Sequence, residues 1–436
     1  MRYRRPTRSP RPARRVMFVL MAVMAAAGTI AFTVAPLYRL QTVGLDPFQL
    51  VVVGSAMEAT VFVAEIPTGI VADAVSRRLS IIIGHAGMGL GFLVEAAWPT
   101  FAGVMAGQVL WGLAYTFTSG ATTAWLTGEL GDPDRTALSS LFLRLSRTGS
   151  VAALVALPVA WLLAGGSLRA PLVAGGVLEL GLAAWLVVAM GEERFTPTPR
   201  HERSTARHLA GIGRAGLHAM RRNRVLAWFA LFALVVGGAS EAYDRLYEAQ
   251  LLGPVGLPDW FGWSPLVSFA LLSMASAVLG IVVPPLVERA RPAASLQRHT
   301  RWLLVLTSLQ IVGLLVFGLT GLFIVAAVAA LVIERCRSVR DTLLSSYLVP
   351  LTPPAERATV LSAFGQADAI GQVVIGPAFG IIGRVISIPA ALVASAVATT
   401  PGLAVIASAG RARAASDARD GSSGPPGDDP VAPARA

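Results

Sequence analysis

The sequence contains no lysine and a single cysteine, Cys336, and only 14% of its 436 residues are charged. Without lysine, a phosphate-binding loop of the Gly-x-x-x-x-Gly-Lys type cannot form, so ATP chemistry of that kind is excluded. One cysteine excludes an intramolecular disulfide bond. Soluble domains carry about a quarter of charged residues, so this chain has too little charge to cover a surface that faces water.

Patterns typical of catalysis and metal binding are also missing. The five histidines are scattered without metal-ligand spacing. No nucleophile motif of the Gly-x-Ser-x-Gly form occurs. We therefore expect no metal, no cofactor and no enzymatic activity. The net charge of +11 would suit nucleic acid, but the arginines concentrate in short segments between apolar runs, which predicts a bilayer as partner instead.

Long apolar runs recur along almost the whole chain, whose mean hydropathy is +0.64. Runs of about 18 or more residues can cross ~30 Å of hydrocarbon, and backbone groups inside lipid must bond internally, so the runs are predicted to be helices. Their continuous rather than alternating pattern excludes a transmembrane barrel. The predicted spans are 17–38, 48–72, 79–97, 100–126, 137–164, 168–190, 225–250, 263–287, 301–319, 322–349, 358–383 and 387–408.

The placement of arginine predicts the orientation of these spans. The loops on one side hold Arg39, Arg169 and Arg384. The arginines of the other side lie in the N-terminal tail, at Arg77–Arg78, at Arg135, and within 194–224, 289–301 and 411–413. Because cytoplasmic loops are enriched in basic residues, we expect a multi-pass protein of the plasma membrane with both termini in the cytoplasm.

A polar, arginine-rich stretch at 191–224 divides the spans six and six. We predict a basic cytoplasmic tail at 1–15, six-helix bundles at 16–190 and 225–409, and a cytoplasmic linker at 191–224 between them. The remainder, 410–436, is rich in Gly, Pro, Ser and Asp and is predicted to be disordered.

The two bundles are related in sequence. A shift of about 222 residues aligns Asp134-Arg135 with Glu356-Arg357 and Ala124-Trp125-Leu126 with Ser346-Tyr347-Leu348, as in the internal repeats of transport proteins. A duplicated unit of this kind places a binding site near the midplane, between the two bundles.

One loop carries a motif. After the second predicted span, Gly69, Asp73, Arg77 and Arg78 follow at fixed spacing in Gly-Ile-Val-Ala-Asp-Ala-Val-Ser-Arg-Arg. This segment resembles the loop signature of the major facilitator superfamily, with Ser76 in place of its second glycine. The resemblance extends over 16–409. It implies an all-α membrane protein of twelve transmembrane helices, arranged as two six-helix pseudo-repeats.

In that superfamily the loop is thought to latch the outward-facing state, and the resemblance implies the same gating role here. A carboxylate is stabilised at a helix N-terminus, so Asp73 is expected to face the start of the eleventh span. Arg77 and Arg78 are expected to reach Glu129 or Asp132 at the end of the fourth span. The alternative is that both arginines only determine topology.

Two features of the drug-exporting branch are altered. Gln108 stands four residues before Gly112, where proton-coupled members carry an arginine. A Gly376-Pro377-x-x-Gly380 element lies in the eleventh span, whereas drug antiporters carry a similar element in the fifth.

Ionisable side chains inside a span cost ~2.5–3.5 kcal/mol on insertion scales, so each needs a partner or a watery cavity. Here they concentrate in the second, fifth, seventh, tenth and eleventh spans, which line the central cavity in the superfamily. The predicted proton- or substrate-binding residues are Glu58, Arg144, Arg147, Glu241, Glu334, Arg337, Asp341, Gln366 and Asp368.

Spacing predicts how some of these charges are arranged. Glu334, Arg337 and Asp341 lie three and four residues apart, so they share a helix face and are expected to pair, either as a structural network or around a substrate. Asp244 and Arg245 lie near the predicted outer interface and are candidates for an outer gate.

Glu58 has no basic residue on its own span. Low hydration favours the protonated form of such a carboxyl group, which suits proton carriage. We therefore expect a monomeric secondary active transporter that moves a small-molecule substrate by alternating access, in proton-coupled efflux of a drug-like compound. Import of a nutrient or metabolite is the alternative within this class. A non-transporting membrane scaffold or enzyme is the alternative outside it.

Overall fold

The computed structural model describes residues 13–131, 135–197, 224–258, 265–290, 292, 295–348 and 357–422, and every regular element in these ranges is helical. The first half of the chain forms α1 (Ala13–Leu37), α2 (Pro47–Ala74), α3 (Arg77–Ala97), α4 (Phe101–Ser119), α5 (Ala121–Leu130), α6 (Arg135–Gly166) and α7 (Ala170–Ala189). The second half forms α9 (Arg224–Gln250), α10 (Pro265–Arg289), α11 (Leu296–Leu319), α12 (Phe323–Leu348), α13 (Arg357–Val374), α14 (Gly376–Val385), α15 (Ile388–Thr399) and α16 (Pro401–Ser422). Short π-helical turns, η1 (Tyr38–Val43) and η2 (Leu251–Val255), extend α1 and α9.

These helices form the predicted twelve spans. Within the described residues, ten stretches are long and apolar enough to cross a membrane. The other two spans are α4 with α5, and α12. Helix α12 is more polar than the ten apolar stretches, since it carries Glu334, Arg335, Arg337, Arg340 and Asp341. The short break predicted after Gly318 is present, since α11 ends at Leu319 and α12 begins at Phe323.

Polar side chains set where several helices begin. Asp46 caps α2 and forms a reciprocal pair of hydrogen bonds with Gln49. Ser76, Thr100 and Ser295 cap α3, α4 and α11, and each accepts a hydrogen bond from a backbone N–H of the first turn. Such caps satisfy amide groups that have no partner inside the helix, so the turns between spans stay short.

Three predicted spans are interrupted rather than continuous. The fourth breaks at Gly120, the eleventh at Ile375 and the twelfth at Thr400. In the last two, Pro377 and Pro401 occupy the first turn of the new helix, where a missing N–H is tolerated. Helix α16 then continues to Ser422, so residues 410–422, expected to be disordered, are helical. The remainder of that tail and most of the predicted linker, residues 198–223, lie outside the described residues.

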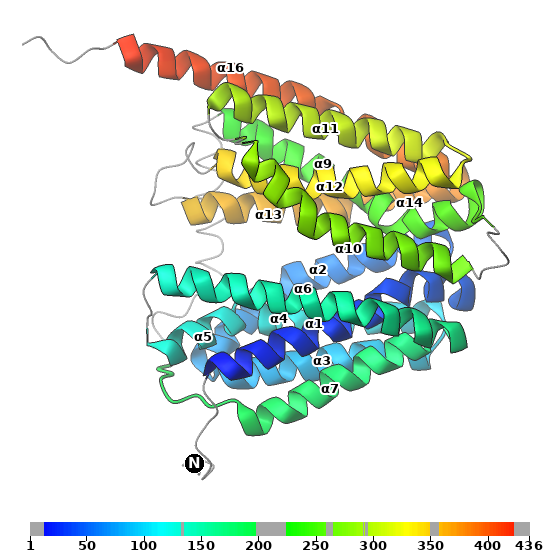
Figure 1. Ribbon diagram of the computed structural model, residues 1–436, viewed down its shortest axis with the longest axis vertical. Helices are drawn as coiled ribbons and strands as arrows, with labels where there is room; N and C mark the ends of the chain where they lie inside the picture. The colour runs from blue at the N-terminus through cyan, green and yellow to red at the C-terminus, as the bar shows by residue number, and fades with distance from the viewer. Residues whose placement is uncertain are drawn as a thin grey trace, which may run out of the picture.

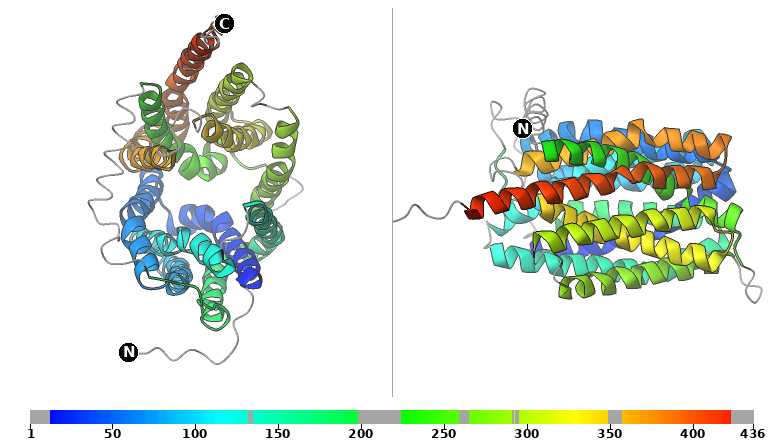
Figure 2. Two further views of the ribbon diagram at one scale, coloured as in Figure 1. Left: turned by 90° about the vertical axis from the view of Figure 1, so that its left-hand side faces the viewer. Right: turned by 90° about the horizontal axis from the view of Figure 1, so that it is seen from above.

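The helices form two groups, α1 to α7 and α9 to α16, called here the first and second halves (Figure 1). Seen along the helices, the halves face each other around a central space (Figure 2, left). We call the end where α1 begins and α16 ends the terminal end. The end with the turns at 43–47, 97–101, 166–170 and 385–388 is the far end.

Hydrophobic packing joins the halves toward the far end. There, Val51 of α2 packs with Leu246 of α9, and the Trp161 ring of α6 stacks on Phe269 of α10 at 6.5 Å. Toward the terminal end, one buried cluster around Trp125 belongs wholly to the first half, and another around Tyr347 belongs wholly to the second. These two aromatic residues occupy the equivalent positions of the predicted repeat.

Small residues make close contacts between the halves. Gly376, Gly380 and Gly383 follow four and three residues apart on α14. A Cβ added to Gly380 would lie 3.0 Å from the Cβ of Val51, and one added to Gly383 would lie 3.1 Å from the Cβ of Pro47. Glycine therefore lets the backbone of α14 approach α2 closely, as in other membrane helix pairs.

Candidate functional site

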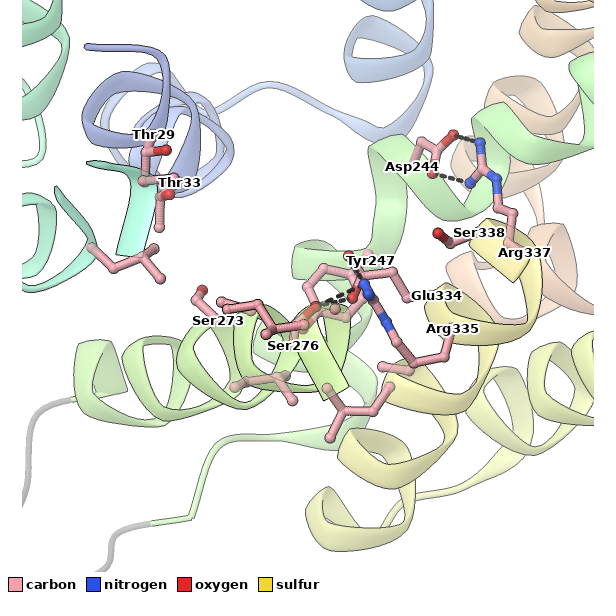
Figure 3. Close-up of a pocket in the computed structure, with 18 of the residues that line it drawn as sticks. Thr29, Thr33, Asp244, Tyr247, Ser273, Ser276, Glu334, Arg335, Arg337 and Ser338 are labelled. Atoms are coloured by element: carbon pink, nitrogen blue, oxygen red, sulfur yellow. Dashed lines mark hydrogen bonds and ion pairs between the residues drawn. The ribbon is translucent and has the colours of Figure 1, made fainter. Parts of the chain in front are cut away.

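A cavity of about 870 Å³ lies between the two halves. Helices α1 and α6 of the first half and α9, α10 and α12 of the second half line it. Figure 3 shows Thr29 and Thr33 on one side, across from Asp244 and Arg337 on the other. Small-molecule sites occupy about 300–1,000 Å³, so this cavity has the size of such a site.

The wall formed by the second half carries paired charges. Asp244 of α9 accepts two hydrogen bonds from Arg337 of α12, at 2.5 and 2.7 Å (Figure 3). Glu334 accepts a hydrogen bond from Ser276 of α10 and pairs with the adjacent Arg335 at 3.1 Å. Arg335 also donates to the Ser276 hydroxyl at 3.2 Å. Charge-assisted bonds of this kind are directional, so they hold α9, α10 and α12 in one wall.

The predicted face of α12 reaches the cavity, but its residues pair differently. Glu334, Arg337 and Asp341 all line the cavity. They do not pair with one another, because each has a nearer partner. Asp341 accepts from the buried Arg340 at 2.7 and 3.0 Å, and Arg340 also donates to Gln310 of α11 at 2.5 Å. This corrects the expected pairing along the helix.

The wall formed by the first half is uncharged among the described lining residues. It consists of Thr29, Thr33, Ser150, Ala153, Leu154 and Leu157. The predicted arginines of α6, Arg144 and Arg147, are exposed and lie outside this lining. Arg147 precedes Ser150 by three residues, so it lies on nearly the same helix face, closer to the terminal end.

Glu58 lies in a second polar cluster, where α2 meets α9 and α13. Its charged neighbours are Arg245, Asp368 and Asp244, and none of the described residues pairs with it directly. Arg245 pairs with Glu241 at 3.1 Å and lies against Gly54 of α2. An added Cβ on Gly54 would be 2.1 Å from the Nε of Arg245. The guanidinium group therefore reaches from the second half onto the surface of the first.

Two further hydrogen bonds belong to the same cluster, and one of them joins the two halves. The Gln372 amide donates to Asp368 at 2.7 Å, and the Ser55 hydroxyl of α2 donates to the Gln372 carbonyl at 2.9 Å. Gln366 is partly buried on α13 and does not line the cavity. Glu241 and Asp368 are likewise absent from the cavity lining, so the predicted site divides into a cavity wall and this interhelical cluster.

Asp244 and Arg245, the two residues predicted for an outer gate, have different partners. Asp244 pairs with Arg337 in the cavity wall, whereas Arg245 pairs with Glu241 and faces α2. Successive residues of a helix point about 100° apart, so two neighbours face different surroundings.

The predicted gating loop bonds within the first half. Arg77 pairs with the exposed Asp73 at 3.2 Å and donates to the Ala124 carbonyl at 3.1 Å. The Arg78 backbone N–H donates to Glu192 at 3.0 Å, and its side chain donates to the Val187 carbonyl. Nothing lies within 4 Å of a Cβ added to Gly69.

Glu129 accepts hydrogen bonds from the backbone N–H groups of Glu193 and Arg194 rather than from either arginine of the loop. This corrects the expected contact with Glu129, while Asp132 lies outside the described residues. Asp73 pairs with Arg77. The residues that precede α13, 349–356, lie outside the described residues.

Buried ion pairs of the first half lie away from the cavity. Arg39 of η1 donates to both carboxylate oxygens of Glu95 on α3, at 2.7 and 3.0 Å, and Gln108 of α4 donates to Glu95 at 2.6 Å. His85 of α3 lies 2.7 Å from Glu179 of α7. Sequence reasoning missed the first set because its members are far apart in the chain. The carboxylate of Glu95 is thus paired with Arg39 of η1. The α4 position at which proton-coupled members carry an arginine holds Gln108 here, which donates a hydrogen bond to Glu95.

Together, the fold and the site define a polytopic helical membrane protein with a polar cavity between two six-helix halves. The sequence profile of the Major Facilitator Superfamily matches residues 16–333, and the chain belongs to that superfamily. The family and the fold indicate a membrane transporter of small molecules rather than an enzyme.

Solved structures with a similar fold are transport proteins. A mutant of the nucleoside transporter NupG is 16% identical, with a TM-score of 0.72 over 92% of this chain and 99% of that one. A bacterial homologue of the human lysosomal transporter Spinster, in an inward-facing and unoccupied conformation, is 14% identical, with a TM-score of 0.71 over 92% and 98%. A mutant of the peptide transporter POT is 16% identical, with a TM-score of 0.68 over 93% and 96%. No curated protein sequence matches the chain significantly.

Proposed function

We propose that this protein is a secondary active transporter that exports a drug-like small molecule across the plasma membrane in exchange for protons. The observation that carries the proposal is the cavity of about 870 Å³ between two halves that meet at one end. Alternating access needs a site of this kind, because the halves rock around a site between them.

The packing supports an inward-facing state. The buried clusters that join the halves lie toward the far end, while those nearer the terminal end each stay within one half. The arginines of the loops favour a cytoplasmic terminal end. With that orientation, the contact between α14 and α2 closes the outer side.

The loop of Asp73, Arg77 and Arg78 fits a switching role in this scheme. In this state its side chains and the Arg78 backbone N–H bond to α3, α5 and residues 187–192 of their own half. Asp73 is 54% exposed at its side chain, so it is available to a partner in the second half when the terminal end closes. We propose that the loop stabilises that outward-facing state.

Glu58 is the proposed proton carrier. It belongs to the first half, while its charged neighbours Arg245 and Asp368 belong to the second. Rocking of the halves changes the distance between Glu58 and Arg245, and a nearby cation favours the ionised carboxylate. The movement therefore changes how readily Glu58 binds a proton, which couples proton transfer to the conformational change.

The test is flux of candidate compounds through vesicles that contain the purified protein, with and without an imposed pH gradient. We expect the gradient to drive accumulation, and Glu58→Gln to abolish the gradient-driven part while leaving substrate exchange. Glu65→Gln is the matched control, because Glu65 lies on the same helix seven residues further and is exposed. Gradient-driven flux that Glu58→Gln leaves unchanged would remove Glu58 from the mechanism.

Import is the second candidate, because two of the similar folds are named as nucleoside and peptide transporters. A growth-inhibition panel in a host that lacks its own pumps separates the two directions. Protection against a toxic compound supports export, whereas sensitisation supports import. An unchanged response to every compound, together with no gradient-driven flux, would favour a non-transporting scaffold.

A further inference from the structure

The charges of the cavity wall do not all cancel. Asp244 is paired with Arg337, Glu334 with Arg335, and Asp341 with Arg340. Glu248 of α9 also lines the cavity, and its Oε2 atom is buried without a hydrogen-bond partner. One carboxyl group of the wall is therefore left over after the internal pairs are assigned.

The arginines that act electrostatically on Glu248 are already engaged. Glu248 interacts electrostatically with Arg39 and Arg245. Arg39 is held by both oxygens of Glu95, and Arg245 is paired with Glu241. A buried charge without a partner is costly, and buried polar atoms without partners are rare, so Glu248 is a group that lacks its counterpart.

Arg335 does not offer a comparable positive site. Its Nε atom is also buried without a hydrogen-bond partner. Its Nη2 atom, however, lies 3.1 Å from Glu334 and donates to Ser276. The charge of this guanidinium group is thus compensated inside the protein, and the group of the cavity wall that lacks an oppositely charged partner is the carboxyl group of Glu248.

Aromatic rings adjoin the unpaired carboxylate. Tyr243 and Tyr247 line the cavity, one turn apart on the same helix as Glu248. Their ring centroids lie 5.5 Å apart, and both rings pack against Phe317 of α11 at 5.6 Å. Faces of tyrosine rings attract cations, so they reinforce a negative site.

The opposite wall suits the rest of such a molecule. Leu154 and Leu157 of α6 and the hydroxyl groups of Thr29 and Thr33 of α1 face the same space. This wall offers apolar surface and hydrogen bonds without fixed charge. A ligand with an apolar body and one positive charge matches both sides of the cavity.

We propose that Glu248 is the anchor of a binding site for organic cations, molecules in which an apolar or aromatic body carries an amine or another positive group. The inference rests on the proposed transport function and names its substrate class. The carboxylate pairs with the cationic group, Tyr243 and Tyr247 contact that group through their rings, and α6 contacts the body.

The test is equilibrium binding to the purified full-length protein of two rigid ions of the same shape and opposite charge, tetraphenylphosphonium and tetraphenylborate. We expect the phosphonium ion to bind and the borate ion not to bind. Glu248→Gln should weaken phosphonium binding about tenfold or more, since a charged partner is lost in a buried site. Glu248→Asp should restore part of the affinity.

Glu288→Gln is the matched control, because Glu288 is exposed near the terminal end of α10 and lies outside the cavity lining. It removes the same charge and should leave phosphonium affinity within about twofold. The comparison of the two ions needs no variant, so it remains decisive even where Glu248→Gln does not fold.

Equal or tighter binding of the borate ion, binding of neither ion, or full phosphonium affinity in folded Glu248→Gln would each overturn the cation site. These outcomes are independent of the flux test. Gradient-driven flux without cation binding would leave the transport proposal standing and remove this substrate class. Cation binding without gradient-driven flux would leave the cation site standing and remove the proposal of proton-coupled transport.

Discussion

The two halves use their buried charges in different ways. In the first half, Glu95 is fully buried and is bonded by Arg39 and Gln108, away from the cavity. In the second half, Asp244 and Arg337 form a pair that is about one-third exposed and lines the cavity. The first of these pairs lies inside one half, and the second lies at the space between the halves.

This difference indicates a division of labour within a duplicated unit. In the proposed transporter, the charged wall would select the substrate, whereas the uncharged wall would offer it no ion pair. The two halves of the predicted repeat thus differ in where these charged pairs lie. Variants that disturb one pair at a time test that division.

The largest effect is expected at Arg39. Arg39→Ala leaves Glu95 buried without its cation and should destabilise the fold by about 3–5 kcal/mol. Thermal unfolding in detergent measures the loss. Arg384→Ala is the control, because Arg384 is exposed and pairs only loosely with Asp46 at 3.6 Å. Equal unfolding temperatures for the two variants would contradict a supporting role for the Arg39 pair.

The pair of Asp244 and Arg337 should contribute less to stability and more to binding. Asp244→Asn frees Arg337 in the cavity wall, so ligand affinity should fall even where the protein remains folded. Because the pair is partly exposed, we expect a coupling energy of about 1–2 kcal/mol in a double-mutant cycle with Arg337→Gln. Strictly additive effects in that cycle would show that the two side chains act separately.

Gly54→Ala tests the contact between the halves. The new Cβ would force the Arg245 guanidinium away from α2, at an expected cost of about 1 kcal/mol to this state. Hydrogen–deuterium exchange in residues 47–55 should increase. Gly69→Ala is the matched control on the same helix, because a Cβ there meets nothing within 4 Å. Similar exchange in both variants would argue that Arg245 moves freely.

Glu334→Gln should have the smallest effect on stability. Glu334 is 49% exposed at its side chain, and its ion pair is with an adjacent residue. Exposed pairs contribute about 0–1 kcal/mol, so the unfolding temperature should hardly change. A loss comparable to that of Arg39→Ala would show that the cavity wall also supports the fold.

Most of the twelve spans were predictable because they rest on continuous apolar runs, and the break at Thr320 was predictable from the glycines beside it. The repeat also placed Trp125 and Tyr347 at equivalent buried positions. These features depend on local composition or on sequence similarity, which a single chain displays directly.

Partners across helices were not predictable in the same way. Spacing placed Glu334, Arg337 and Asp341 on one face of α12, but it could not show that Arg337 would pair with Asp244 of α9. The bond from Arg39 to Glu95 spans 56 residues. Such choices depend on how each helix is rotated and tilted against its neighbours, which packing decides. Glu248 stands out only once the other carboxyl groups of the cavity wall have been assigned their partners.

The glycines of α14 determine how the contact between the halves responds to salt. Dissolved salt screens charges over a Debye length of about 8 Å at physiological strength, but it leaves close packing of a glycine backbone against apolar side chains untouched. Gly380 against Val51 and Gly383 against Pro47 are contacts of that second kind. The ion pair of Arg384 and Asp46 nearby is weakened by high salt, yet such solvent-exposed pairs contribute less than about 1 kcal/mol to stability. The far end should therefore stay shut in dilute and in saline surroundings alike.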